Sequence, residues 1–251
     1  MKITNNYNLP ESLVRAISID RYKKVGDISI TEMLLPPQIR YLRLKHAEMI
    51  EEDAADRIWL LLGSSVHAIL ERQKTDNQFD EEKLTIECEG WKVSGTSDIL
   101  DADGTLWDYK VTSVWTVVYG GRVEWEQQLN AYRVLWDAAG FNVKNLRIVA
   151  IFRDWSLTAM RKDKHGKYPK CPVAVLTIPK WEMATAHNFI KERVRIHKET
   201  EKTGRFPNCD EEDLWITKTG YRNRCEDYCN VNKFCEQYKQ YKNGNNNKLP
   251  F

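Results

Sequence analysis

Apolar residues recur at helical spacing in two segments of the chain. In the first, over residues 57–74, they are Ile58, Leu61, Leu62, Val66, Ile69 and Leu70. In the second, over residues 124–139, Leu129, Tyr132 and Trp136 mark the face that we expect to be buried. Gly140 then provides a natural end, because glycine readily takes the positive φ of a helix C-terminus. The pattern predicts two helices that enclose a segment of different periodicity.

The segment between these helices is rich in strand-forming residues. Residues 91–100 and 106–112 read as two strands, and Asp101-Ala-Asp-Gly104 between them is typical of a turn. If residues 102–104 form the loop, position 101 faces 105 and Asp98 lies opposite Asp108, with Cβ atoms roughly 4.5–5.5 Å apart. Side chains alternate along a strand, so Asp108 and Lys110 share a face.

The remaining patterns predict an α/β fold with a mixed sheet flanked by helices. Two more strands are expected near 146–153 and 172–178, a basic loop at 162–169 and a long charged helix over 180–203. The expected parts are an N-terminal helical segment (1–56) with a break at Pro36-Pro37, a core (57–203), a cysteine-bearing C-terminal segment packed on the core (204–242) and a flexible tail (243–251).

Asp98, Asp108 and Lys110 form the most informative chemical set. Two like charges opposite each other are destabilising without a counter-ion, and a divalent cation between them removes that penalty. Mg²⁺ accepts one or two carboxylates together with waters and phosphate oxygens. An Asp-x-Lys string alone is more often a solvated ion pair, but here it stands among other polar residues at regular spacing.

Both flanking helices carry such residues. Gly63, His67 and Glu71 recur at four-residue steps and therefore line one face, where His67 could be a metal ligand or a proton carrier and Glu71 could support it. Gln128 and Tyr132 are also four residues apart. Their side chains could orient a water or a phosphate, although the Tyr132 ring is also suited to the core.

These strings together resemble the RecB-like branch of the PD-(D/E)XK nuclease superfamily, which includes phage-type exonucleases. The strings are Gly63-Ser-Ser-Val-His67-Ala-Ile-Leu-Glu71, Gly95-Thr-Ser-Asp98, Asp108-Tyr-Lys110 and Gln128-Leu-Asn-Ala-Tyr132. The resemblance spans roughly residues 60–235 and implies a restriction-endonuclease-like core. The second acidic position, often Glu in that branch, is Asp108 here, which keeps the charge and the ligand type.

The resemblance also implies an activity and its residues. Mg²⁺ or Mn²⁺ would be bound by Asp98 and Asp108, with His67 as a further ligand. Lys110 would position the attacking water, and Gln128 and Tyr132 would be active-site or DNA-contacting residues. The implied function is a metal-dependent deoxyribonuclease, most often an exonuclease, in bacterial or phage DNA recombination or repair.

A second set of candidate ligands is a group of cysteines near the C-terminus. Cys225, Cys229 and Cys235 lie close together, with Cys209 upstream. No basic and apolar leader opens the sequence, so we expect a cytoplasmic protein, in which clustered thiols indicate a metal rather than disulfides. Thiolates favour Zn²⁺ or an iron–sulfur cluster, and the alternative is buried or reactive thiols without a metal.

The resemblance bears on the same cysteines. Many relatives hold a [4Fe–4S] cluster with one cysteine before the core and three after it. Here prolines occupy the expected N-terminal position, in Pro36-Pro37, and Cys209 could instead complete a C-terminal set of four. An iron–sulfur cluster is favoured over zinc, and its role would be structural.

Composition limits the partners. The net charge of +2 means that DNA affinity must come from local patches. Candidate patches are Arg40, Arg43, Lys45 and His46; Arg153, Arg161, Lys162, Lys164 and Lys167; and Arg222, Arg224, Lys233, Lys239 and Lys242. Trp115 and Trp125 could stack on an unpaired base. No apolar run approaches the roughly 18 residues of a membrane helix.

Two other classes of function fit the sequence. The chain could be a non-catalytic nucleic-acid-binding module, against which the Asp/Asp/Lys/Gln set argues. It could also be a subunit that works within a helicase–nuclease or recombination assembly, either with a partner protein or as a homo-oligomer. Because the sequence has no ATP-binding Gly-x-x-x-x-Gly-Lys-Ser/Thr string, any motor would be a partner.

Overall fold

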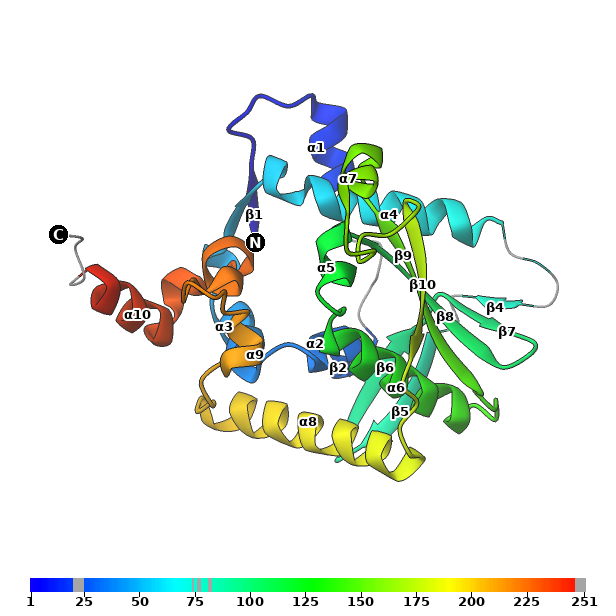
Figure 1. The fold of residues 1–251 in the computed structure, drawn as a ribbon. Helices are drawn as coiled ribbons and strands as arrows, with labels where there is room; N and C mark the ends of the chain where they lie inside the picture. Colours follow the sequence, from blue (N-terminus) through cyan, green and yellow to red (C-terminus); the bar gives the residue numbers. More distant parts are fainter. Residues whose placement is uncertain (20–24, 74, 76–77, 81–82, 247–251) are drawn as a thin grey trace. The chain divides into compact units, whose positions relative to one another are not determined.

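The chain divides into two compact units (Figure 1). The computed structural model describes residues 1–19, 25–73, 75, 78–80 and 83–246. Residues 20–34 and 59–192 form one unit, called here the central unit, and residues 1–19, 35–58 and 193–251 form the other, called the terminal unit. The segments 1–56 and 204–242, predicted as separate parts, both contribute to the terminal unit.

The central unit contains a five-stranded mixed sheet with the order β10-β9-β8-β7-β4. Its strands are β4 (Gln78–Asp80), β7 (Ile99–Asp101), β8 (Thr105–Thr112), β9 (Asn145–Phe152) and β10 (Val173–Ile178). Strands β8 and β9 run parallel, and the other neighbours are antiparallel. This mixed sheet with its helices confirms the predicted α/β class and the strands expected near 146–153 and 172–178.

The β7–β8 hairpin has the register that the turn chemistry predicts. Ile99 pairs with Trp107 and Leu100 with Leu106, so the next positions outward are Asp98 and Asp108. Gly104 has a φ of 85°, which a side chain at this turn position would disfavour. The turn therefore fixes which carboxylates face each other.

A smaller sheet contains the first half of the segment predicted as one strand over 91–100. The chain leaves β6 (Trp91–Thr96) and enters β7 in the other sheet, and Ser97 and Asp98 lie between the two strands. β6 pairs with β5 (Lys83–Cys88) and with β2 (Ile28–Ser29). The single predicted strand is thus wrong, and Asp98 lies where the chain crosses between sheets.

Helix α6 (Val123–Ala138) connects the two sheets. It contacts strands of both of them, and its buried residues include Leu129, Tyr132 and Trp136, as predicted. Gly140 follows with a φ of 89°. This unit also contains α2 (Ile30–Met33), which lies in the segment predicted to be helical, and the first half of α8 (Met183–Thr203). Two further helices, α5 (Val114–Val118) and α7 (Leu157–Lys162), were not predicted by the sequence patterns.

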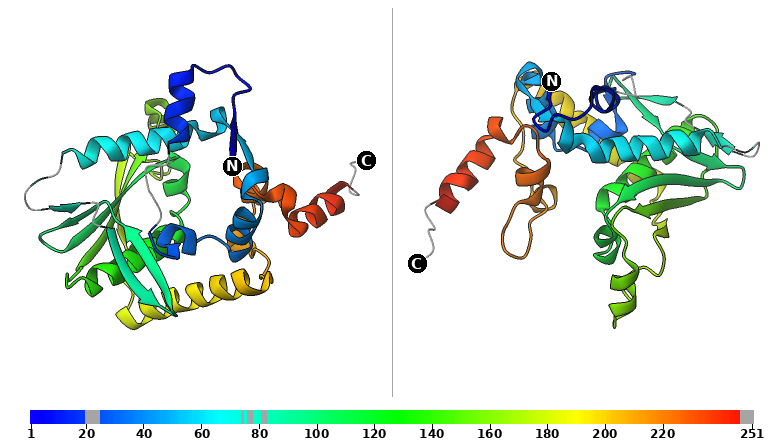
Figure 2. Two further views of the ribbon diagram at one scale, coloured as in Figure 1. Left: turned by 180° about the vertical axis from the view of Figure 1, so that it is seen from behind. Right: turned by 90° about the horizontal axis from the view of Figure 1, so that it is seen from above.

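Helix α4 (Ile58–Glu71) confirms the first predicted helix, and its apolar residues are only partly covered. Figure 2 shows α4 (cyan) running along one end of the five-stranded sheet. None of its residues is buried, and Leu62 and Ile69 are 39% and 60% exposed. Apolar spacing identifies the helix, but it does not reveal how much of its surface another element covers.

The terminal unit combines both ends of the chain. Its elements are β1 (Lys2–Thr4), α1 (Glu11–Ser18), α3 (Pro37–Lys45), η1 (Ala47–Met49), β3 (Glu51–Asp53), η2 (Ala54–Arg57), the second half of α8, α9 (Glu211–Leu214), η3 (Arg224–Tyr228), η4 (Asn232–Phe234) and α10 (Glu236–Asn246). β1 and β3 form a parallel pair, which the prediction of an entirely helical N-terminal segment missed. Pro37 begins α3, since a proline suits the first turn, where no N–H partner is needed.

No helix in the described ranges combines the length and the apolar character that crossing a membrane requires.

Candidate active site

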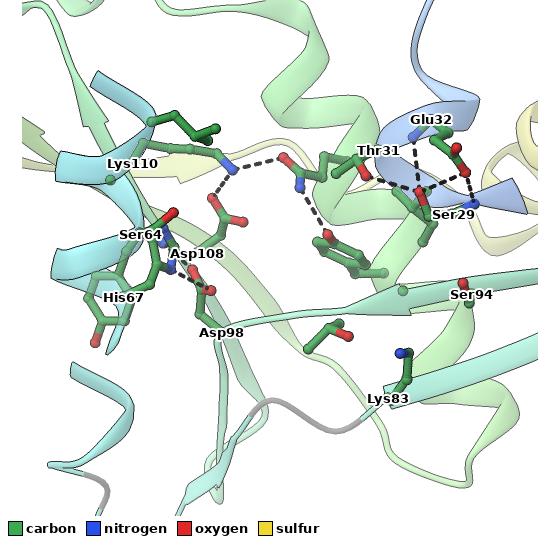
Figure 3. A pocket seen from close by; sticks show the side chains of 18 of the residues that line it. Ser29, Thr31, Glu32, Ser64, His67, Lys83, Ser94, Asp98, Asp108 and Lys110 are labelled. Carbon is green, nitrogen blue, oxygen red and sulfur yellow. Dashed lines mark hydrogen bonds and ion pairs between the residues drawn. The ribbon is translucent and has the colours of Figure 1, made fainter. Parts of the chain in front are cut away.

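The centre of the site is the carboxylate of Asp108 on β8. Asp108 is 4% exposed, and Lys110 on the same face places Nζ 2.7 Å from Asp108 Oδ2 (Figure 3). Burial is the main cause that raises the pKa of Asp108, with the nearby Asp98 carboxylate acting in the same direction and Lys110 opposing it. The fold thus holds the Asp108 carboxylate in surroundings that disfavour its ionised form. A cation bound there would stabilise that form.

Asp98 is held at the sheet junction by two contacts. Its Oδ2 accepts a hydrogen bond of 2.6 Å from the backbone N–H of Tyr109, and its Oδ1 lies 3.0 Å from His67 Nδ1. The first contact continues the β7–β8 pairing outward, and the second reaches α4. Asp98 and Asp108 line the same pocket, as the predicted register requires.

His67 is the residue of α4 that meets the carboxylates. The hydrogen bond to Asp98 raises the pKa of His67, although burial acts in the opposite direction. Gly63 lines the pocket one turn earlier, and a Cβ there would meet no other atom within 4 Å. Glu71, the predicted support, is the last residue of α4 and is not part of the pocket lining.

Gln128 and Tyr132 form a chain of hydrogen bonds behind Lys110. Lys110 Nζ donates to Gln128 Oε1 at 2.9 Å, and Gln128 Nε2 donates to the Tyr132 hydroxyl at 3.0 Å (Figure 3). The four-residue spacing on α6 places both side chains on one face. The Tyr132 ring is buried in the core, while its hydroxyl orients the amide that holds Lys110.

Close packing explains why the first residue of Gly95-Thr-Ser-Asp98 is a glycine. A Cβ on Gly95 would lie 2.8 Å from the Tyr132 ring and 3.0 Å from Ile30 and from Leu135. The strand therefore approaches α6 too closely for any side chain. This contact between β6 and the helix restricts the position of the Tyr132 ring.

The pocket that these residues line has a volume of about 620 Å³. It also contains polar residues that the sequence patterns did not suggest, namely Ser29, Thr31, Glu32, Lys83 and Ser94. Ser29 and Glu32 form a capping box at the start of α2. The Ser-x-x-Glu string is the signal that could have placed a helix start here, but only the β2–β6 pairing brings it to the pocket.

The donor set of the pocket fits a divalent cation. Asp108 Oδ2 is buried and ion-paired with Lys110 Nζ at 2.7 Å, and it has no further hydrogen-bond partner among the described residues. In the described part of the chain, no three or more His, Cys, Asp or Glu side chains form a ready ligand group. Waters and phosphate oxygens complete the shell of Mg²⁺ in sites with one or two carboxylates.

The four C-terminal cysteines lie together in the terminal unit. Cys209, Cys225, Cys229 and Cys235 line one cavity of about 10 Å³, with Gln38 on its wall. They pack against Ile39, Leu42 and Ile50. The segment 204–242, predicted to pack on the core, packs on the N-terminal segment within its own unit. Its four thiols line one cavity, but among the described residues they do not form a group placed to bind a metal ion.

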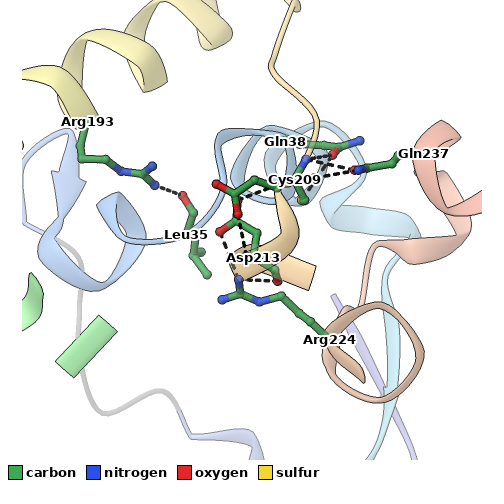
Figure 4. A network of polar contacts seen from close by, with 8 residues as sticks. Leu35, Gln38, Arg193, Cys209, Asp213, Arg224 and Gln237 are labelled. Carbon is green, nitrogen blue, oxygen red and sulfur yellow. Dashed lines mark hydrogen bonds and ion pairs between the residues drawn. The ribbon is translucent and has the colours of Figure 1, made fainter. Parts of the chain in front are cut away.

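Gln38 and Gln237 hold the cysteine loops (Figure 4). Gln38 Nε2 donates to Cys235 Sγ at 3.1 Å, and Cys209 Sγ donates to Gln38 Oε1 at 3.4 Å. Gln237 forms a pair of hydrogen bonds with the backbone of Cys209, with its Oε1 3.0 Å from the N–H and its Nε2 2.8 Å from the carbonyl. The resemblance places the first cysteine at Pro36-Pro37, and Gln38 directly follows these prolines. The Gln38 amide therefore lines the cavity in the region where relatives have a cysteine.

Burial raises the pKa of three of these thiols, those of Cys209, Cys225 and Cys229. Burial, followed by the nearby Asp213 carboxylate, raises the pKa of Cys209 to about 12, and burial raises the pKa of Cys225 to about 11. A metal bound by them would have to displace these protons, because thiolates are the ligands.

Two predicted DNA contacts are wrong. Arg40 is 4% exposed and pairs with Glu201 at 2.8 Å, so it belongs to the interior rather than to a basic patch. Trp125 is 7% exposed and is a core residue. Trp115, by contrast, is 48% exposed.

The comparisons with known proteins establish the fold but no function. No family model and no curated protein matches the sequence. A solved structure described as the crystal structure of SSO0001 is similar, with a TM-score of 0.59 at 16% identity over 90% of this chain and 95% of that chain. At this identity the similarity concerns the arrangement of the elements alone.

Proposed function

We propose that this chain is a metal-dependent deoxyribonuclease, most simply an exonuclease, that hydrolyses DNA phosphodiester bonds. The observation that carries the proposal is the convergence of Asp98, Asp108 and Lys110 in one pocket, with Lys110 hydrogen-bonded to Gln128. These residues come from a strand junction, a strand and a helix. Their side chains match those that the resemblance to RecB-like nucleases assigns to the active site.

Asp98 and Asp108 would hold the cation, with His67 beside them as a further ligand. Mg²⁺ or Mn²⁺ bound there would lower the pKa of a water and offset negative charge on the phosphate. To serve as a ligand, His67 would exchange its contact with Asp98 for one with the metal. Asp108 would exchange its contact with Lys110 in the same way.

Lys110 would position the attacking water or a phosphate oxygen. Its ammonium has three donors, of which one is used by Gln128 Oε1 at 2.9 Å. Once the cation takes over the charge of Asp108, the other donors face the pocket. Gln128 fixes the direction of the ammonium, and Tyr132 fixes the direction of the Gln128 amide.

We further propose that the four cysteines hold a metal centre that stabilises the terminal unit. A [4Fe–4S] cluster is preferred because of the resemblance, and Zn²⁺ is the alternative. Cys209 would supply the ligand that relatives place before the core. Its loop is already fixed by Gln237, so the ligand comes from an ordered backbone.

DNA is the proposed partner, and cytoplasmic DNA recombination or repair the proposed setting. The chain could work alone, as a homo-oligomer or with a recombination protein. A nuclease assay on end-labelled linear double-stranded and single-stranded DNA, with Mg²⁺, Mn²⁺ or EDTA, tests the activity. We expect degradation that EDTA abolishes, and the product ladder reports exonuclease or endonuclease action. No cleavage by the folded, metal-loaded protein would contradict the proposal and favour a nucleic-acid-binding subunit.

A further inference from the structure

An exposed aromatic side chain lines the carboxylate pocket at the start of α4. Trp59 lies four residues before Gly63 and eight before His67, so the three share one face of the helix, and all of them line the pocket. Trp59 is 55% exposed. The Arg153 guanidinium lies over its ring, with Cζ 4.7 Å from the centroid. A large aromatic face with a cation on it thus stands beside the catalytic residues.

A stacked aromatic pair lies at α5, with Trp115 in the helix and Tyr119 directly after it. Trp115 and Tyr119 are 48% and 80% exposed, and their rings stack with centroids 5.9 Å apart and an interplanar angle of 26°. The Trp115 ring also makes an edge-to-face contact with the buried Tyr168 ring, with centroids 5.8 Å apart. The pair is therefore held from behind while its outer faces remain open.

The end of β9 connects the two aromatic groups. Arg153 covers Trp59, and the next residue, Asp154, accepts hydrogen bonds from Ser113 Oγ at 2.6 Å and Val114 N–H at 2.7 Å at the start of α5. The Arg153 N–H also donates to the Thr112 carbonyl at the end of β8. One dipeptide thus fixes the positions of both groups relative to β8, which carries Asp108 and Lys110.

The segment 161–168, whose Tyr168 contacts the Trp115 ring, is mainly basic. Arg161, Lys162, Lys164 and Lys167 are exposed in α7 and in the loop after it. The acidic residue within residues 161–167 is Asp163, whose carboxylate accepts hydrogen bonds from the backbone N–H groups of His165 and Tyr168. Aromatic faces next to cations are suited to unpaired bases with phosphates alongside, because every base has a face that can stack. The bases of a closed duplex cannot use such faces.

We infer that Trp59 with Arg153, and Trp115 with Tyr119, form a base-stacking subsite that guides an unpaired DNA strand into the carboxylate pocket. The inference rests on the proposed function and adds the substrate form, a single strand or a frayed end. Trp59 and His67 are ~12 Å apart along α4, roughly the rise of three to four stacked nucleotides. A base on Trp59 would therefore precede the scissile phosphate by a few positions.

Equilibrium binding without cleavage tests this subsite. Fluorescein-labelled dT20 and a blunt 20-base-pair duplex would be titrated with the full-length protein in EDTA, and anisotropy would give the Kd. We expect tighter binding of dT20 than of the duplex. Trp59→Ala and Tyr119→Ala should each weaken dT20 binding by roughly tenfold, since a stacked base contributes about 1–3 kcal/mol. Trp59→Phe should retain most of the affinity.

The matched control is Tyr7→Ala, because Tyr7 is 71% exposed in the terminal unit and outside this subsite. Melting temperatures would show that the variants fold. Equal Kd values for dT20 and duplex, or equal Kd values for Trp59→Ala, Tyr119→Ala and Tyr7→Ala, would overturn the inference. Loss of cleavage with dT20 binding and its Trp59 dependence intact would count against the proposed nuclease activity alone.

Discussion

The carboxylate pocket and the cysteine cavity both gather metal-ligand residues, but they differ in the space around those residues. The pocket has a volume of about 620 Å³ and is lined by charged and polar side chains. The cysteine cavity has a volume of about 10 Å³, close to the least that one water needs. A substrate can enter the first site only. Ligand residues alone therefore do not define a catalytic site, because open space beside them is also required.

The two sites also differ in what their residues do for the fold. Asp108 is a buried charge beside a second carboxylate, so its ionised form costs the folded state free energy. The cysteines are packed among apolar residues, and Gln38 and Gln237 form hydrogen bonds with two of them, Cys235 and Cys209. We therefore expect substitutions of the charged pocket residues to remove activity without loss of stability, and substitutions of the cysteines to do the reverse.

Asp108→Asn should give the largest change. Cleavage in Mg²⁺ should fall roughly a thousandfold or more, since a lost metal ligand removes several kcal/mol of charge stabilisation. In EDTA at pH 7, the melting temperature should rise. The raised folded-state pKa means that ionisation destabilises the fold above that pKa, so the gain should disappear as the pH falls towards about 4. Asp137→Asn, on the exposed end of α6, is the control for both measurements.

Cys209→Ser should have the opposite effect. Loss of one metal ligand should lower the melting temperature by about 5 °C or more, equivalent to about 2 kcal/mol for a chain of this size, with iron or zinc content falling in parallel. Cys229→Ala should behave alike. Cys171→Ser, at an exposed cysteine outside the cavity, should change neither quantity. An unchanged melting temperature, together with no iron or zinc in the native protein, would contradict a metal at the cysteines.

Two glycines at the pocket provide a matched pair for packing. Gly95→Ala would place a Cβ 2.8 Å from the Tyr132 ring, whereas Gly63→Ala would meet nothing within 4 Å. Overpacking costs roughly 1–3 kcal/mol, so Gly95→Ala should lower the free energy of unfolding in urea by this amount. Gly63→Ala should leave it unchanged or raise it, since alanine favours the helix. Equal stability of the two variants would show that the β6–α6 contact is not as close as described.

The hydrogen-bond chain behind Lys110 should show graded effects. Gln128→Leu removes the acceptor that holds Lys110, and Tyr132→Phe removes only the hydroxyl one bond farther away. We expect kcat at saturating DNA to fall roughly tenfold or more for Gln128→Leu, and less for Tyr132→Phe, since each bond contributes about 1 kcal/mol. A larger loss for Tyr132→Phe would instead indicate a direct contact of the hydroxyl with DNA.

The smallest change in melting temperature should come from substitution of Asp53, which lines neither the carboxylate pocket nor the cysteine cavity. Its carboxylate accepts hydrogen bonds from the N–H groups of Asn6 and Ala55, and these lower its pKa. The lowered folded-state pKa means that this stabilisation is present above the unfolded pKa and is lost as the pH falls through the folded value. Asp53→Asn should therefore lower the melting temperature slightly at pH 7, with the difference shrinking in acid. Asp56→Asn, in the short helix η2 that follows Asp53, is the control.

Local patterns predicted the parts of the site that lie near each other in the chain. The turn at residues 101–104 was sufficient to predict that Asp98 and Asp108 would be neighbours, and helical spacing was sufficient for Gln128 and Tyr132. The approach of β6 to α6 could not be predicted, because it depends on packing between elements distant in sequence. A glycine at position 95 does not by itself indicate this contact, because the Tyr132 ring that requires it is distant in sequence.

Burial was harder to predict than element type. The exposed apolar face of α4 and the buried position of Arg40 both depend on tertiary neighbours that periodicity does not identify. The same holds for the cysteines: their spacing indicated a cluster, but the contact with α3 depends on pairing the two ends of the chain. Trp59 was overlooked because an aromatic residue in an apolar helix usually indicates core.

The central claim is that the carboxylate pocket cleaves DNA, and Lys110 provides the most direct test. Cleavage rates of end-labelled DNA in Mg²⁺ would be compared for the native protein, for Lys110→Ala and for Lys180→Ala, which changes an exposed lysine outside the pocket. We predict that Lys180→Ala matches the native rate, while Lys110→Ala, folded by circular dichroism, shows no cleavage above the EDTA control. Full activity of Lys110→Ala would contradict the assignment of the site.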